Sequence, residues 1–281
     1  MAYKSILTVA AAPEGAGIAV DAGAKLALKG DAHLEALSIG VDRTQLGYSY
    51  IGAGAVMIQV AMERAEEEAR ANEKALKEAL EAQGPDLRSS LDSVVAQLGA
   101  VGDLVAARAR YSDLVVLSKP YGPAAGPEAE AVVEAAMFEG GAPVLIVPET
   151  GLASATPRRV VLAWNQSREA LVAARRALPL LKTAEQVVIT VVDPPVHGPE
   201  RSDPGGMLCQ LLVRHGVKAE VSVLAKTLPR VSDVLARQCQ DLDAELLVMG
   251  AYGHSRFREA ILGGATRNSL EATQVPVFLA H

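Results

Sequence analysis

Three glycines with a fixed spacing are the feature of this sequence best suited to chemistry. Gly250, Gly253 and Gly263 follow the apolar run Leu246–Met249, with two residues between the first pair and nine between the second. A glycine at a strand end lets backbone approach a ligand closely and permits a positive φ. The pair Gly263-Gly264 before a helical segment would place N–H groups at the positive end of a helix, which suits phosphate. Ordinary turn and cap glycines would give the same spacing, so the glycines alone leave both interpretations open.

The segments that must position this loop occur twice along the chain. In each half a buried strand is followed by an Ala-rich helix and a second buried strand. The predicted elements are Lys4–Val9, Ala16–Leu28 and Leu34–Val41 in the first half, and Arg159–Ala163, Arg168–Leu181 and Val187–Val192 in the second. A long helix over Ile58–Gln83 then corresponds to a shorter one near Met207–His215, and its acidic run Glu66–Glu68 is predicted to be a solvated face. The strands are near-continuous apolar runs, which is typical of a parallel sheet covered on both faces.

We therefore predict an α/β fold with two tandem, doubly wound, parallel sheets of the Rossmann-like or flavodoxin-like kind. Each half reads β-α-β-α-β-α-β-α-β, which gives five strands per sheet. A small-residue linker, Gly151–Pro157, separates a domain over residues 1–150 from a domain over residues 158–281. Sheets of this kind bind ligands beyond the carboxyl ends of their strands, where the strand order reverses.

Composition excludes several classes of function. The 281 residues carry a net charge of −6 and only 4% aromatic side chains, which argues against binding a nucleic-acid backbone or stacking its bases. The 2 cysteines and 5 histidines show neither a disulfide framework nor the spacing of metal ligands. No signal-peptide organisation and no run of 18 apolar residues is present, so we expect a soluble cytoplasmic protein without a membrane segment.

The glycine spacing also carries a family resemblance. Gly250-x2-Gly253-x9-Gly263, after an apolar strand and before a last strand preceded by Pro276, resembles the universal stress protein family. The first half follows the same element order, so the resemblance covers essentially the whole chain and implies two such domains fused in tandem. Several proteins of this family bind ATP or AMP at that loop, and others bind no nucleotide. The family has no well-defined catalytic chemistry, so the resemblance implies a protein that is not an enzyme, with slow ATP hydrolysis as the most it would do.

The resemblance implies a nucleotide site in the second half. The family's acidic residue at the end of the first strand falls at Asn165, which keeps hydrogen-bonding capacity but loses the charge. The adenine-contacting backbone falls at Val191, with Val192 as the neighbouring alternative. The family motif ends in Gly followed by Ser or Thr, and Gly264 stands at that position, so only backbone donors remain there. The implied nucleotide-binding residues are Ala163, Asn165, Val191, Met249, Gly250, Gly253, Gly263, Gly264 and Ala265.

The first half departs further from the family pattern. Ala11 stands where the second half has Asn165, and Glu130 falls where it has Gly263. Three prolines after the fourth strand remove backbone donors that a phosphate cradle needs; they are Pro120, Pro123 and Pro127. We therefore predict that the first half does not bind nucleotide in the family manner and instead completes an intramolecular pseudo-dimer. Family members commonly pair through their last strands, which implies contact between Val144–Val147 and Val277–Leu279.

Two classes of function stay open. One is a stress-response sensor or signalling module that binds ATP or AMP in its second half and needs no metal. The other is a structural or protein-interaction stress protein whose glycine loop is vestigial. A hydrolase is a distant third, because no nucleophile–base pair or metal triad is visible in the sequence. The expected partners are an adenine nucleotide and another copy of the chain in a homodimer, with no nucleic acid and no membrane.

Overall fold

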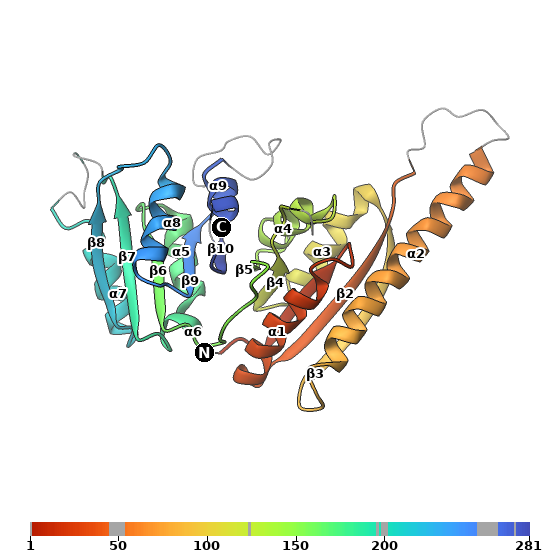
Figure 1. The fold of residues 1–281 in the computed structure, drawn as a ribbon, viewed down its shortest axis with the longest axis horizontal. Coiled ribbons are helices and arrows are strands. Elements are labelled where there is room, and N and C mark those ends of the chain that lie inside the picture. The colour runs from red at the N-terminus through yellow and green to blue at the C-terminus, as the bar shows by residue number, and fades with distance from the viewer. Residues whose placement is uncertain are drawn as a thin grey trace. The chain divides into compact units, whose positions relative to one another are not determined.

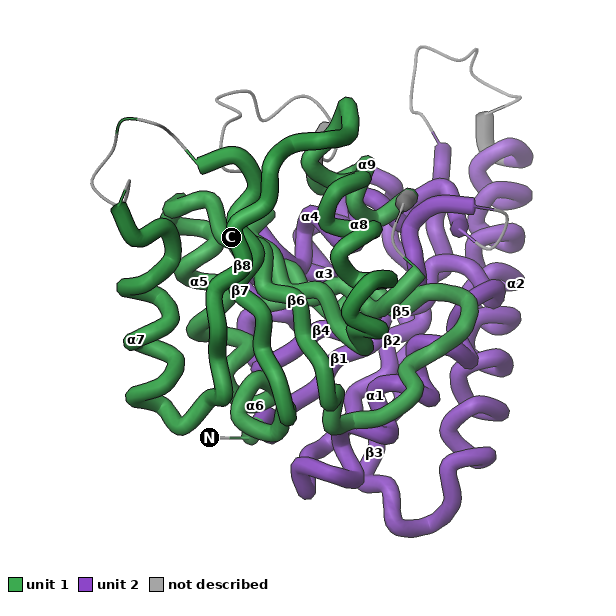
Figure 2. The backbone as a smooth tube through the Cα atoms, turned by 60° about the vertical axis from the view of Figure 1, so that its left-hand side comes forward, with its two compact units in different colours: residues 1–2, 143–281 green, residues 3–142 purple. Residues whose placement is uncertain are grey.

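The computed structural model describes residues 2–44, 54–122, 125–194, 197, 202–251, 264–272 and 274–281. Its contacts divide the chain into two compact units (Figure 2). The N-terminal unit contains residues 3–142, and the C-terminal unit contains residues 1–2 and 143–281. Of the helices within the described ranges, none has the length and apolar character that a membrane span requires.

The N-terminal unit is a parallel sheet with helices (Figure 1). Its elements are β1 (Ser5–Ala10), α1 (Ala16–Gly30), β2 (His33–Asp42), α2 (Gly54–Glu81), β3 (Arg88–Gln97), a 3-10 turn (Leu98–Ala100), α3 (Val101–Ala109), β4 (Leu114–Ser118) and α4 (Ala129–Met137). The strand order is β3-β2-β1-β4, and β1 pairs in parallel with both β2 and β4. The order reverses between β1 and β4, so the carboxyl ends of these two strands form the crevice of this sheet.

The C-terminal unit repeats this plan and adds one strand from the first half. Its elements are β5 (Val144–Val147), β6 (Arg159–Ala163), α5 (Arg168–Arg176), α6 (Leu178–Leu181), β7 (Gln186–Val192), α7 (Gly206–Arg214), β8 (Ala219–Leu224), α8 (Val231–Asp241), β9 (Leu246–Gly250), α9 (Gly264–Ala272) and β10 (Val277–Ala280). The strand order is β5-β10-β9-β6-β7-β8. The pairs β10–β9, β9–β6, β6–β7 and β7–β8 are parallel, whereas β5 pairs antiparallel with β10.

The predicted α/β class with two repeated parallel sheets is confirmed. The predicted pairing of the last strands is also present, because Ile146 lies opposite Val277 and Val144 lies opposite Leu279. Contacts group β5 with the C-terminal unit although it is the fifth strand of the first half. The domain boundaries at residues 150 and 158 therefore remain a prediction.

Helix boundaries differ from the prediction at one place in the second half. The helix predicted over Arg168–Leu181 is divided: α5 ends at Arg176, and α6 begins at Leu178 with Pro179 in its first turn. Proline has no N–H to donate to the preceding turn and its ring crowds the carbonyl four residues earlier, so a continuous helix is unfavourable there. Proline is tolerated in a first turn, which is the position it takes in α6.

Small aliphatic side chains fill both cores, as the low aromatic content predicts. Residues Ile6–Ala10 of β1 are buried throughout, and so are Val187–Val191 of β7. The outer strands β3 and β8 are instead half exposed, because only one of their edges is paired. Close packing of small residues is clearest at Gly40, where an added Cβ would lie 1.9 Å from the carbonyl oxygen of Ala65. The helix α2 therefore rests directly on the backbone of β2.

Candidate functional site

The crevice of the C-terminal unit lies between β6 and β9. The chain leaves β6 toward β7 and β8 on one side, and it returns to β9 and β10 on the other. The carboxyl ends of β6 and β9 are thus the point at which strand order reverses, where doubly wound sheets bind their ligands. Ala163 ends β6 and Gly250 ends β9, so the structure brings these two predicted site residues to neighbouring strand ends.

A short turn joins β6 to α5 and fixes the orientation of Asn165. The side-chain oxygen Oδ1 of Asn165 accepts a hydrogen bond of 3.1 Å from the backbone N–H of Ser167. Gln166 between them has a φ of 62°, in the left-handed region. The hydroxyl of Ser167 then caps α5 by accepting a 3.1 Å hydrogen bond from the backbone N–H of Ala170. This capping role was missed from the sequence, although serine directly before a helical segment is its usual signal.

Gly250 has a packing role that the sequence did not reveal. A Cβ added there would lie 2.4 Å from the backbone nitrogen of Ala170 and 2.6 Å from the carbonyl carbon of Glu169. The first turn of α5 therefore packs against the end of β9 without room for any side chain. The backbone that comes close to Gly250 is thus that of α5. This packing explains why a glycine stands at position 250 without any ligand.

The backbone N–H and C=O groups of successive residues in β7 are directed alternately to β6 and to β8. The carbonyl of Thr190 accepts a hydrogen bond of 2.9 Å from Trp164, on the β6 side, whereas the N–H of Asp193 donates to Leu224 of β8 at 2.8 Å. Groups of alternate residues share a side, so the backbone of Val191 is directed to β8. The groups of Val192 are directed to the β6 side, where β6 has already ended. The geometry moves the backbone candidate from Val191 to its neighbour Val192.

Trp164 is a packing residue rather than a stacking platform. It is buried, with 8% of its surface exposed. A Cβ added to Gly205 would lie 3.5 Å from Cδ1 of Trp164 and 3.4 Å from a methyl carbon of Val191. Gly205, which has a φ of 85°, precedes the first residue of α7, so it combines a left-handed turn with contact to these side chains. The buried side chain of Val191 belongs to the core and is not presented to the crevice.

The remaining predicted residues fall partly outside the described ranges. Gly253 and Gly263 lie outside the described residues. The described part of α9 is Gly264–Ala272, so Gly264 and Ala265 lie in this helix. Met249 has 8% of its surface exposed, so only its backbone is available to a ligand. Among the described residues no group of three His, Cys, Asp or Glu side chains is arranged to hold a metal ion.

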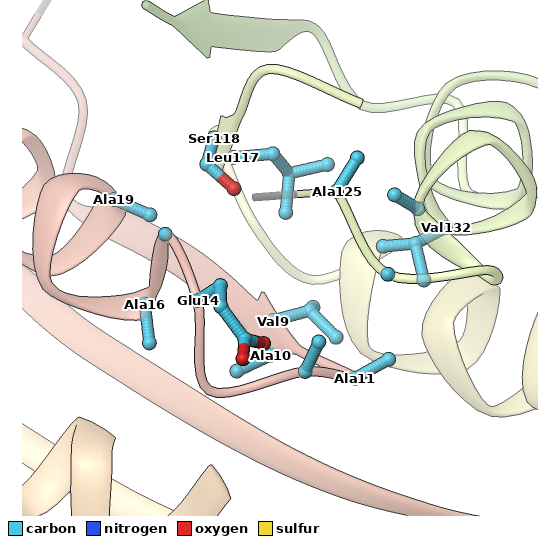
Figure 3. Close-up of a pocket in the computed structure, with 14 residues that line it drawn as sticks. Val9, Ala10, Ala11, Glu14, Ala16, Ala19, Leu117, Ser118, Ala125 and Val132 are labelled. Atoms are coloured by element: carbon cyan, nitrogen blue, oxygen red, sulfur yellow. The ribbon is translucent and has the colours of Figure 1, made fainter. Parts of the chain in front are cut away.

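The corresponding crevice of the N-terminal unit holds a small, mostly apolar cavity (Figure 3). Its volume is about 40 Å³. One ordered water needs roughly 10–15 Å³, so the cavity formed by the described residues accommodates a few waters. Alanine and valine side chains dominate its walls, and Glu14 and Ser118 add a carboxylate and a hydroxyl. A carboxylate repels phosphate, and Ala11 contributes only a methyl group at the position that corresponds to Asn165.

An ion-pair cluster beside this cavity was also missed from the sequence. Arg43 follows β2, and its guanidinium lies 2.9 Å from Oε1 of Glu128, the residue before α4. The same guanidinium lies 2.8 Å from Oε1 of Glu68 on α2. Burial opposes the charged guanidinium, but the hydrogen bonds that Arg43 donates to both carboxylates outweigh it and raise the pKa of Arg43. Arg43 and Glu128 are 85 positions apart in the sequence, so no local sequence pattern predicts their contact.

Comparison with known proteins agrees with this architecture. The model of the Universal stress protein family matches residues 156–281. The universal stress protein Slr1230 of Synechocystis sp. is 32% identical over 97 residues, which cover 31% of this chain and 33% of that protein, so the match spans about a third of the relative.

Two solved structures share the fold over nearly the whole chain. A universal stress protein of Archaeoglobus fulgidus has a TM-score of 0.69 at 15% identity, with 98% of this chain and 96% of that chain covered. A protein of unknown function from Pseudomonas aeruginosa has a TM-score of 0.58 at 16% identity, with 99% and 92% covered. The second half of the chain thus matches the model of the universal stress protein family over residues 156–281, and the first half places a second domain of the same fold before it.

Proposed function

We propose that the protein is a cytoplasmic stress-response module that binds an adenine nucleotide, ATP or AMP, in its C-terminal unit. The observation that carries this proposal is the position of α9. This helix is described over Gly264–Ala272, and Gly264 follows the last glycine of the motif in the sequence, so the glycine loop leads into the N-terminal part of a helix, as a phosphate site requires. No metal is needed for such binding, because backbone donors and the helix terminus supply the positive potential.

The proposed roles follow from the crevice between β6 and β9. The backbone of Val192 would pair with the adenine edge, since its groups are directed to the side on which β6 has ended. Asn165 already uses its Oδ1 within the turn, which leaves Nδ2 as the donor that it would offer to ribose or phosphate. Gly253 and Gly263 would supply loop backbone to the phosphates. Binding and signalling, rather than catalysis, is the proposed activity, and a homodimer of two such chains is a further expectation of the family resemblance.

One alternative is favoured by specific observations. The packing of α5 explains Gly250 without a ligand, and Gly264 lacks the hydroxyl that the family motif usually supplies. Both are expected of a structural or protein-interaction member whose loop no longer binds nucleotide. The N-terminal unit, with its 40 Å³ cavity and Glu14, is proposed to bind no nucleotide in either case.

Calorimetric titration of the full chain with ATP, ADP and AMP separates the two functions. Binding is expected for the unchanged protein and is expected to be lost in Gly263→Val, because a branched side chain would enter the phosphate loop. Gly99→Val is the matched control, since a Cβ at Gly99 meets nothing within 4 Å. No heat for any nucleotide up to the millimolar range would establish the alternative. Binding that survives Gly263→Val would show that the site lies elsewhere. Mass spectrometry of gently purified protein would detect a nucleotide that co-purifies.

A further inference from the structure

The first turns of α2 expose large apolar side chains to water. The exposed fractions are 65% for Val56, 67% for Met57, 41% for Ile58 and Val60, and 39% for Met62. Residues 56–60 are all exposed, which means that every side of the helix faces solvent there. Gln59 is the one polar residue among them and donates a 2.9 Å hydrogen bond to Glu63. An apolar helix surface is normally buried. We call residues 56–62 the apolar end of α2.

Packing elsewhere on α2 explains why the described residues of the N-terminal unit do not cover this end. The helix touches its sheet closely at Ala65, whose carbonyl oxygen would lie 1.9 Å from a Cβ on Gly40. Ala65 and Ala69 are buried, whereas Val56–Val60 are not. At a rise of about 1.5 Å per residue, the residues before Ala65 extend the helix by roughly 16 Å beyond that contact. Figure 1 shows this end of α2 continuing past β2.

Charge changes abruptly at the border of the apolar end. No charged residue occurs between Arg43 and Glu63, a stretch that includes the whole apolar end. Glu63, Glu66 and Glu67 then follow, with Arg64 among them, and all four are exposed. Glu66 also lies 3.7 Å from Arg70, one turn further along the helix. We call Glu63, Glu66 and Glu67 the acidic collar, which outnumbers Arg64 and leaves this border negative. The surface therefore combines an apolar patch with a negative rim, and a complementary partner needs an apolar face with positive flanks.

We propose that the apolar end of α2 and its acidic collar dock an amphipathic, basic helix of a partner protein. The apolar face of that helix covers Val56, Met57 and Val60, and its lysine or arginine side chains meet the collar. Helices commonly bind in this manner through an apolar stripe, and the flexible methionine side chains adapt to its shape. A second copy of the chain would bring two acidic collars together, and an anionic bilayer would repel the collar, so both occupants are disfavoured. The surface lies in the N-terminal unit and does not depend on nucleotide binding.

The probe is a synthetic helix of about 18 residues with leucine on one face and lysine on the other, labelled for fluorescence anisotropy with the full chain. A scrambled peptide of the same composition, which lacks an apolar face, is the control ligand. The double variant Met57→Gln/Val60→Gln is expected to weaken binding at least tenfold. Met207→Gln is the matched control, because Met207 is 73% exposed on α7 of the other unit, and it is expected to leave binding unchanged. Glu66→Gln/Glu67→Gln is expected to reduce the dependence of affinity on salt.

Circular dichroism first establishes that each variant is folded. A loss of binding then shows that the substituted side chains form the binding surface. The proposal is overturned if the unchanged protein does not prefer the amphipathic peptide over the scrambled one. It is equally overturned if the double variant binds as the unchanged protein does. Sedimentation of the free chain and flotation with zwitterionic vesicles complete the test. Self-association or vesicle binding that the double variant abolishes would assign the surface to a second copy or to lipid instead.

Discussion

Replacing Gly250 with alanine tests whether close helix packing maintains this glycine. The new Cβ would lie 2.4 Å from the backbone nitrogen of Ala170 and 2.6 Å from the carbonyl carbon of Glu169. Both atoms belong to the backbone around the start of α5, so no change of rotamer relieves the contact. Overpacking of this kind typically costs about 1–3 kcal/mol. That is a large share of the roughly 5–15 kcal/mol by which a domain is stable.

Urea unfolding without nucleotide measures this cost. Trp164, the only tryptophan in the chain, is buried beside Gly205 and reports on the C-terminal unit through its fluorescence. With an m-value of about 1–3 kcal/mol per molar urea, the midpoint should fall by roughly 1 M. Gly17→Ala is the control, because nothing lies within 4 Å of its added Cβ. This change should stabilise α1 by up to about 1 kcal/mol, which unfolding monitored by circular dichroism would measure. An unchanged midpoint for Gly250→Ala would refute the packing argument and return the glycine to a ligand-binding role.

Three further outcomes are expected. Asn72→Ala should cost about 1–3 kcal/mol in thermal or urea unfolding, because buried Asn72 donates a 2.9 Å hydrogen bond to a β2 carbonyl; a cost below about 0.5 kcal/mol would contradict this. Burial opposes ionisation of Glu245, but hydrogen bonds from Arg158 outweigh it and hold the pKa of Glu245 below its ordinary value of 4.5. At acidic pH the folded state thus binds fewer protons than the unfolded state. The stabilisation by Glu245 is present above about pH 5 and is lost as the pH falls through the folded-state pKa. Glu245→Gln should therefore reduce the loss of stability on acidification, and a pH profile identical to that of the unchanged protein would count against the pairing. Burial raises the pKa of Cys239 to about 12, so iodoacetamide at pH 8 should modify the more accessible Cys209 first, and equal rates by mass spectrometry would show the assignment to be wrong.

The two halves of the chain place different residues at corresponding crevices. Both place a crevice at the carboxyl ends of their first and fourth strands. In the C-terminal unit Gly264, which follows the motif glycines in the sequence, lies in helix α9. In the N-terminal unit the matching crevice has a cavity of about 40 Å³ with Glu14 in its wall. A carboxylate in this wall opposes phosphate, and Ala11 and Glu130 depart from the family pattern. That the first half binds no nucleotide therefore stays a prediction.

Much of the fold was predictable because it depends on patterns that are local along the chain. Near-continuous apolar runs such as Leu114–Leu117 can be stable only as buried strands of a covered parallel sheet. The Ala-rich segments between them have helical spacing, and the same order occurs twice. The helix predicted over Arg168–Leu181 is divided because it contains Pro179. A proline is tolerated in the first turn of a helix but interrupts a helix at an interior position. Element order, fold class and the repeat therefore followed from the sequence by itself.

The packing of the described residues around the crevice was decided only by the tertiary structure. Spacing identified Gly250, but the approach of α5 to the end of β9 supplies its physical reason. The direction of the strand bonds, which depends on the register of β7 with β6 and β8, separates Val192 from Val191. The pairing of Arg43 with Glu128 spans 85 positions. Contacts of this kind arise when whole elements pack within a few ångströms, and the order of hydrophobic and polar residues along the chain does not specify those distances.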